Sequence, residues 1–92
     1  MTLALADAWA RIRPRQVHGI SAVLLPYTSD GAIDWAAFEG HLARTKAAGL
    51  DVAVNMDTGF VDLLTARERA AVLDATRQTL GADVTFYAGA FP

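Results

Sequence analysis

The sequence contains no cysteine, which excludes disulfide bonds, thiolate metal centres and thiol catalysis. The absence of cysteine is compatible with a cytoplasmic location, which we expect for this protein. Long apolar runs are also lacking, and none reaches the ~20 residues that span a bilayer. Asp7 and Arg11 interrupt the N-terminal segment where a signal peptide would need its apolar stretch. We therefore expect neither a signal peptide nor a membrane partner.

The chain also lacks an excess of charge of either sign. Eight lysine and arginine residues against ten aspartate and glutamate residues give a formal net charge of −2. The basic residues are scattered, apart from Arg11, Arg13 and Arg15, so a nucleic-acid partner is not expected. His18 and His41 are far apart and lack metal-ligand spacing. We expect no metal site, and nothing in the sequence indicates a cofactor.

The composition is that of a globular chain, with 53% hydrophobic and 20% charged residues among 92 positions. This length gives one domain at most. We divide the chain into an N-terminal extension or helix over 1–18 and a segment of alternating strands and helices over 19–92. Residues 3–13 have a weakly amphipathic pattern that Pro14 would end, which predicts a short N-terminal helix.

Three apolar runs predict β-strands at 20–25, 51–55 and 84–88. The first run is uniformly apolar, which is typical of a parallel strand that is buried on both faces. Segments 49–54 and 81–86 share the form Gly-x-Asp-Val-x-apolar, 32 positions apart. A repeat of this length that alternates strands with helices predicts right-handed crossovers and a parallel sheet.

The segments between the strands carry clear helix signals. Asp34 is a good N-cap residue, and Gly49 suits the left-handed position that follows a last helical turn. Thr65 and Glu68 form the S/T-x-x-E capping box of a second helix, which Gly81 ends. The expected buried stripes are Trp35, Phe38, Leu42 and Thr45 in the first helix and Val72, Leu73, Thr76 and Leu80 in the second.

The predicted fold is therefore α/β, with the order β-α-β-α-β and parallel strands. Two larger architectures contain this order: one half of an open doubly wound sheet, and the first part of a (β/α)8 TIM barrel of ~250 residues. No glycine-rich phosphate-binding loop follows the first strand, in residues 25–31, which weighs against a dinucleotide-binding half. Three parallel strands alone would leave two unpaired edges, so we expect the chain to be the N-terminal fragment of a barrel.

The polar turn at 55–59 follows the second strand and carries the candidate site residues. Parallel α/β proteins build their sites at this end of their strands. Asp57 is the candidate catalytic group, and Thr58, Gly59 and Asn55 are the candidate substrate-binding residues. The alternatives are an Asp57 that caps its own backbone, a Gly59 that only supplies a positive φ, and an Asn55 that is a strand-end hydrogen bonder.

Several short segments match, in order and spacing, the motifs of one enzyme family. Those motifs are a T-P-F-like turn, a D-G-x-I-D segment, a helix that ends at a glycine, a G-T-T-G-E turn, an L-(T/S)-x-x-E-R segment and a strand that ends in A-G. Their counterparts here are 25–27, 30–34, 49–51, 56–60, 64–69 and 88–89. On these motifs, residues 19–89 resemble the N-terminal part of the dihydrodipicolinate synthase / N-acetylneuraminate lyase family.

The resemblance implies a Schiff-base lyase or aldolase on a TIM barrel. In that family a lysine on a later strand forms an imine with pyruvate or another 2-keto acid, and a tyrosine shuttles protons. Both would fall beyond Pro92, and Lys46, in the middle of a helix, is no substitute, so this piece alone should be inactive. Thr58 and Gly59 match the turn that holds the keto acid's carboxylate. The resemblance also implies a keto-acid or sugar-acid substrate and a homo-oligomer, either a dimer or a tetramer, with Tyr27 at the barrel mouth or against a neighbouring subunit.

Three positions depart from the family pattern: Asp57 replaces the first threonine of the turn, Phe60 its glutamate, and Leu25 the threonine of T-P-F. An ionised Asp57 would repel a substrate carboxylate. Either Asp57 is protonated, or it binds a hydroxyl group or a cation, or the substrate is not a simple 2-keto acid. We therefore expect a divergent member with an altered substrate.

Two alternatives of other classes remain open. The chain could be a non-catalytic α/β remnant or module. Asp57-Thr58-Gly59 is also the D-T-G of aspartic proteases, in which two aspartates share one proton. Those proteins are nearly all β and continue with alanine or serine where this chain has Phe60, so two predicted helices weigh against them.

Overall fold

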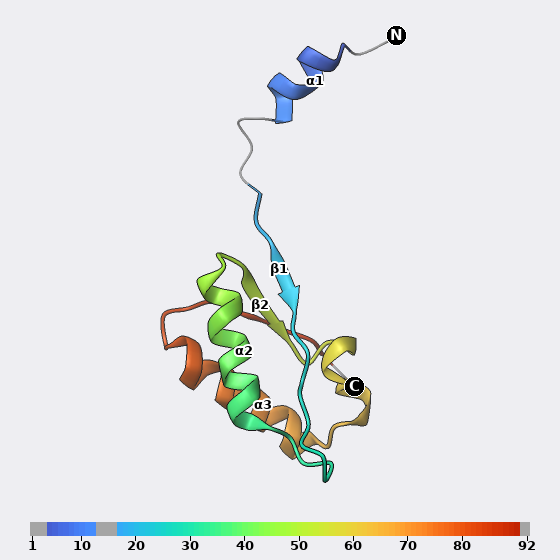
Figure 1. The fold of residues 1–92 in the computed structure, drawn as a ribbon, viewed down its shortest axis with the longest axis vertical. Helices are drawn as coiled ribbons and strands as arrows, with labels where there is room; N and C mark the ends of the chain where they lie inside the picture. The colour runs from blue at the N-terminus through green and yellow to red at the C-terminus, as the bar shows by residue number, and fades with distance from the viewer. Residues whose placement is uncertain (1–3, 13–16, 91–92) are drawn as a thin grey trace.

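The computed structural model describes residues 4–12 and 17–90. It is a mixed α/β structure with a three-stranded parallel sheet in the order β1-β2-β3 (Figure 1). The strands are β1 (Ile20–Ala22), β2 (Asp51–Val54) and β3 (Tyr87–Ala88), and the α-helices are α1 (Leu5–Ile12), α2 (Trp35–Ala47) and α3 (Ala66–Leu80). Two short 3-10 turns, η1 (Asp57–Gly59) and η2 (Val61–Leu63), connect β2 to α3. The predicted order β-α-β-α-β and the parallel pairing are confirmed.

Helix α2 begins and ends at the predicted residues. The Asp34 carboxylate accepts a hydrogen bond from the Ala37 amide at 3.1 Å, so it caps one of the free N–H groups of the first turn. At the other end Gly49 has a φ of +85°, and the amides of Gly49 and Leu50 donate to the carbonyls of Lys46 and Thr45. This pair of bonds is the Schellman arrangement, which needs a left-handed residue and therefore favours glycine.

Helix α3 begins at the predicted capping box. The Thr65 hydroxyl accepts from the Glu68 amide at 3.1 Å, and the Glu68 carboxylate accepts from the Thr65 amide at 2.9 Å. Gly81 ends the helix with a φ of +98°. The two helix boundaries were therefore predictable, because caps depend on residues that are close in sequence.

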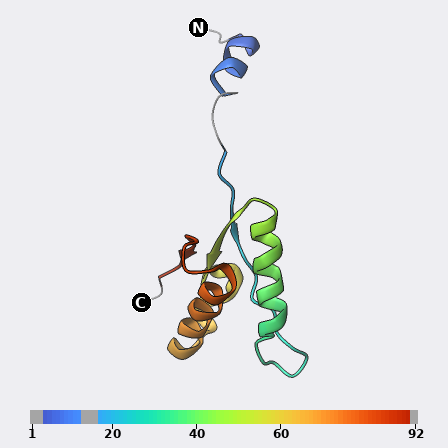
Figure 2. The ribbon, with the colours of Figure 1, turned by 90° about the vertical axis from the view of Figure 1, so that its left-hand side faces the viewer.

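The helices α2 and α3 pack against each other and against one face of the sheet (Figures 1 and 2). The core between them consists of Val23, Leu25, Phe38, Leu42, Val52, Val54, Leu64 and Val72. Trp35 packs edge-on to Phe38, with ring centroids 6.2 Å apart, at the margin of this core. The prediction that Leu73 is buried is wrong: it is 36% exposed, because it points about 100° around the helix axis from Val72.

The opposite face of the sheet is not covered by a helix in the described chain. Along β1 and the residues after it, Val23 and Leu25 are buried, whereas Ile20 and Leu24 are more than half exposed. The predicted burial of this strand on both faces is therefore wrong for these residues, because helices pack on one face only. The predicted strands at 20–25 and 84–88 are also longer than the observed β1 and β3.

Helix α1 confirms the predicted N-terminal helix over Leu5–Ile12; position 3 and residues 13–16 lie outside the described part of the chain. Its Leu5 and Trp9 side chains are exposed. Among the described residues, no helix is both long and apolar enough to cross a membrane.

Candidate functional site

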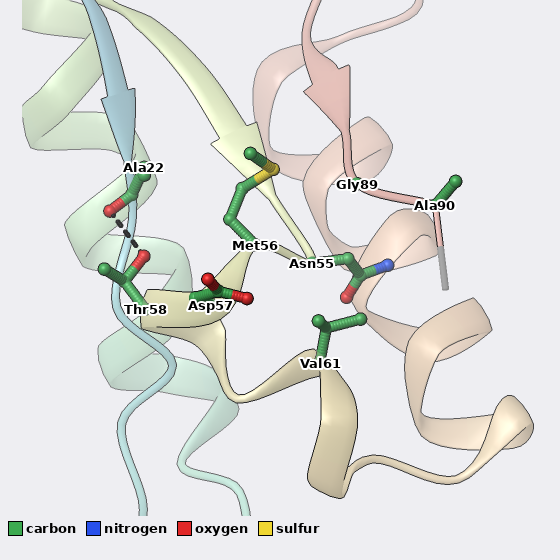
Figure 3. A pocket seen from close by; sticks show the side chains of 8 residues that line it. All are labelled: Ala22, Asn55, Met56, Asp57, Thr58, Val61, Gly89 and Ala90. Carbon is green, nitrogen blue, oxygen red and sulfur yellow. Dashed lines mark hydrogen bonds between the residues drawn. The ribbon is translucent and has the colours of Figure 1, made fainter. Parts of the chain in front are cut away.

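The carboxyl ends of the three parallel strands meet at one edge of the sheet, and a hollow of about 460 Å³ opens there (Figure 3). The end of β1, the turn after β2 and the residues after β3 all contribute to it. Its lining consists of Ala22, Asn55, Met56, Asp57, Thr58, Val61, Gly89 and Ala90. Three of the four candidate residues of the turn therefore face one hollow, at the place in the sheet where the sequence predicts a site.

The turn after β2 is bracketed by two residues with left-handed backbones. Asn55 has a φ of +55° and Phe60 a φ of +58°. Asparagine tolerates this conformation, but a bulky side chain such as phenylalanine rarely adopts it. A residue held there costs on the order of 1–3 kcal/mol and persists only where the surrounding structure imposes it. The tertiary structure thus fixes the shape of this turn against local preference.

Gly89 lies directly against the turn. A Cβ at position 89 would overlap the Asn55 carbonyl oxygen and would come within 3.1 Å of the Met56 sulfur. The Gly89 amide donates to the Val54 carbonyl at 2.9 Å, which extends the pairing of β2 and β3 by one bond. Only a residue without a side chain allows this close approach.

Asn55 is 5% exposed, and its side chain joins the turn to α3. Its Nδ2 donates to the Arg69 carbonyl at 3.3 Å, which fixes the orientation of the amide because the carbonyl can only accept. Its Oδ1 is buried and has no hydrogen-bond partner among the described residues. A buried acceptor without a partner costs about 1–3 kcal/mol. The Asn55 nitrogen thus matches the alternative of a strand-end hydrogen bonder, whereas substrate binding by Asn55 stays a prediction.

The Asp57 side chain is exposed and lines the hollow. Within the described residues its carboxylate has no hydrogen bond and no ion-pair partner, so it does not cap its own backbone. No lysine, arginine or histidine belongs to the lining of the hollow. The carboxylate is therefore the one formal charge among the described residues that line the hollow.

Thr58 and Gly59 are held by bonds within the fold. The Thr58 hydroxyl donates to the Ala22 carbonyl at 2.9 Å, with the Val23 carbonyl at 3.3 Å, and so ties η1 to the end of β1 (Figure 3). The Gly59 amide donates to the Met56 carbonyl at 3.0 Å. Gly59 is buried, lines no part of the hollow and does not have a positive φ, so the alternative that it supplies one is wrong.

Other residues considered from the sequence do not join this site. His18 and His41 do not line the hollow, and no cluster of potential metal ligands occurs among the described residues. Tyr27 lies beside Phe60, with ring centroids 6.1 Å apart, and each of the two residues is 41% exposed. Sequence reasoning missed the structural role of Gly89, although a glycine directly after a strand is the usual signal of a close backbone approach.

The aspartic-protease alternative requires a nearly all-β chain. The helices α2 and α3 and the parallel sheet do not fit that architecture. Asp57 also follows a strand of a parallel α/β sheet here, which is a different setting from that of the protease D-T-G.

No protein-family model matches the chain, and no curated protein matches it either. The resemblance described above therefore rests on the sequence motifs alone.

Proposed function

We propose that the sheet is the first part of a (β/α)8 barrel, and that the hollow is the portion of a carbon–carbon lyase or aldolase site that its first three strands build. The observation that carries the proposal is the gathering of Asn55, Asp57 and Thr58 at the carboxyl edge of three sequential parallel strands. In (β/α)8 enzymes the loops at this edge supply the catalytic and binding residues. The exposed second face of β1 suits such a barrel, whose remaining strands would cover it.

The proposed reaction begins with an imine between a lysine and a pyruvate-type 2-keto acid, as the family resemblance implies. Lys46 is the only lysine of the sequence, and its Nζ is 3.0 Å from the carboxylate of Asp51, the first residue of β2. The hollow lies beyond the last residue of β2, at the opposite edge of the sheet. The proposal therefore needs a lysine and a proton-shuttling tyrosine from later strands of a longer chain, which would act as a cytoplasmic dimer or tetramer.

Borohydride trapping of the full-length natural protein tests this proposal. An imine forms with loss of water, and borohydride reduces it to a stable secondary amine on the lysine. After incubation with pyruvate and sodium borohydride, one lysine-containing peptide should gain the mass of the reduced adduct, and it should not contain Lys46. Replacement of the modified lysine by arginine is the control and should abolish the adduct. No adduct with any of several 2-keto acids would favour the non-catalytic module instead.

A further inference from the structure

The side-chain atoms at the hollow that remain open to a ligand's hydrogen bonds are acceptors. Asn55 Oδ1 is buried and has no partner in the described part of the chain, while the amide nitrogen of the same side chain is committed to the Arg69 carbonyl. In Figure 3 this oxygen is turned toward the side of the hollow where Val61 and Asp57 lie. Asp57 adds two carboxylate oxygens, which only accept when ionised. A ligand group that enters here therefore finds the exposed Asp57 oxygens as acceptors, and a group that displaced the atoms covering Asn55 Oδ1 would also satisfy that buried oxygen.

Part of the donors of the same turn are in use. The single hydroxyl proton of Thr58 is directed at the Ala22 carbonyl, which leaves its oxygen lone pairs for a ligand. The amides of Gly59, Phe60 and Val61 all donate to carbonyls within the turn. The amides of Met56, Asp57 and Thr58 have no hydrogen bond to the described residues, and all three belong to or adjoin the residue that carries the carboxylate. A substrate anion would thus approach a negative charge, with no basic side chain in the described lining to offset it.

We infer that this hollow binds a ligand through a group that donates hydrogen bonds, a hydroxyl or an ammonium group, and that Asp57 and Asn55 select such a group over a carboxylate. The inference rests on the proposed function only in taking the hollow as part of the site. A divalent cation fits less well, because Mg²⁺ and Ca²⁺ are usually held by several carboxylate or carbonyl oxygens and the lining offers one carboxylate. The keto acid's own carboxylate would then be bound by residues outside this turn.

Three small probes of matched size separate the possibilities: propylammonium, propane-1,2-diol and propionate. Each is titrated into the ¹⁵N-labelled full-length natural protein, and the amide signals of Asn55, including its side-chain NH₂, Asp57 and Gly89 are followed by NMR. The ammonium probe, the diol or both should shift these signals at concentrations at which propionate does not. Propionate shifts of equal or greater size, or no shift with any of the three probes, would overturn the inference.

Two variants and a control assign the effect to the named residues. Asp57→Asn keeps the size and removes the charge, and should weaken propylammonium binding about tenfold while it affects the diol less. In the unsubstituted protein, tighter binding of propylammonium than of the diol identifies ammonium as the preferred group, and the reverse order identifies hydroxyl. Asp62→Asn removes the same charge from an exposed residue outside the hollow and should change neither. An equal effect of both variants would contradict the assignment to Asp57.

Asn55→Gly deletes the buried oxygen and permits the left-handed backbone, so it should weaken both donor probes. If this variant does not fold, Asp57→Asn still decides the question, because the Asp57 side chain is exposed and has no partner to lose among the residues that the structure describes. The outcome is also independent of the lyase proposal. Borohydride trapping detects imine formation at the lysine, whereas the NMR titrations detect binding at the turn after β2. Either proposal can therefore be contradicted while the other is supported.

Discussion

Gly89 and Asn55 are in direct backbone contact at the edge of the sheet, so that a Cβ on Gly89 would occupy the space of the Asn55 carbonyl oxygen. This contact joins the end of β3 to the turn that carries Asp57. In Gly89→Ala the new Cβ would clash with the Asn55 backbone, and no side-chain rotation can relieve this clash. We expect a loss of about 1–3 kcal/mol in the free energy of unfolding, measured by urea denaturation.

Gly40→Ala is the matched control for this substitution. Gly40 lies inside α2, where a Cβ would meet only the terminal nitrogen of Arg44, at 3.2 Å. Alanine is favoured over glycine in a helix interior by about 1 kcal/mol, so this variant should be more stable than the natural sequence. If both alanine variants changed the free energy of unfolding in the same direction, the close contact of Gly89 with Asn55 would not explain the effect of Gly89→Ala.

The Thr58 hydroxyl holds the site turn to β1 through the Ala22 carbonyl. Thr58→Val keeps the shape of the side chain and removes the donor, which should cost about 1 kcal/mol of unfolding free energy. Thr58→Ser keeps the hydroxyl and should lose less. Equal losses in the two variants would mean that the methyl group, and not the bond to Ala22, is what matters.

The capping box of α3 gives a further test of stability. Thr65→Ala removes the acceptor of the Glu68 amide and should destabilise the chain by about 1 kcal/mol, seen as a lower urea midpoint. Thr65→Ser retains the acceptor and should lie close to the natural sequence. A serine variant as unstable as the alanine variant would contradict the cap.

The loop before α2 predicts a pH effect at Asp30. The hydrogen bond from the Thr28 hydroxyl lowers the pKa of the Asp30 carboxyl below its ordinary value of 3.8. Hydrogen bonds from the backbone amides of Ala32 and Asp30 lower this pKa further, by smaller amounts. Since the pKa is lower in the folded than in the unfolded chain, the ionised group stabilises the fold above pH 3.8. This contribution disappears as the pH falls through the folded-state pKa.

An NMR titration of the Asp30 carboxyl carbon measures this shift. Thr28→Val should raise the pKa of Asp30 toward the ordinary value, because the largest cause is removed, whereas Thr28→Ser should leave it low. A valine variant with an unchanged titration midpoint would show that the backbone amides alone are responsible.

The helix boundaries were predictable because their causes are local. Asp34, Gly49, Thr65 and Gly81 each act on groups within a few residues, and all four occupy the predicted cap or terminal positions. Strand lengths were not predictable, because strand pairing depends on a partner that is distant in the sequence. Residues 84–86 have the expected apolar pattern, yet the ladder with β2 forms only at Tyr87–Ala88.

The site was predictable in position but not in detail. The turn after β2 lies at the carboxyl edge of the sheet, as expected for a parallel α/β chain. The left-handed backbone of Phe60 could not be foreseen, because tertiary contacts impose it against local preference. The engagement of the Thr58 hydroxyl with Ala22, 36 residues earlier in the sequence, likewise depends on the folded sheet.

The central claim is that these three strands are the first three of a (β/α)8 barrel. The mass of the natural gene product tests this claim most directly. Intact-mass spectrometry of the protein from its native source is compared with the 9.8 kDa of the present sequence. Our account predicts a chain of ~250 residues, long enough for eight strands and their helices. A natural product that ends near Pro92, at 9.8 kDa, would contradict both the barrel and the imine mechanism.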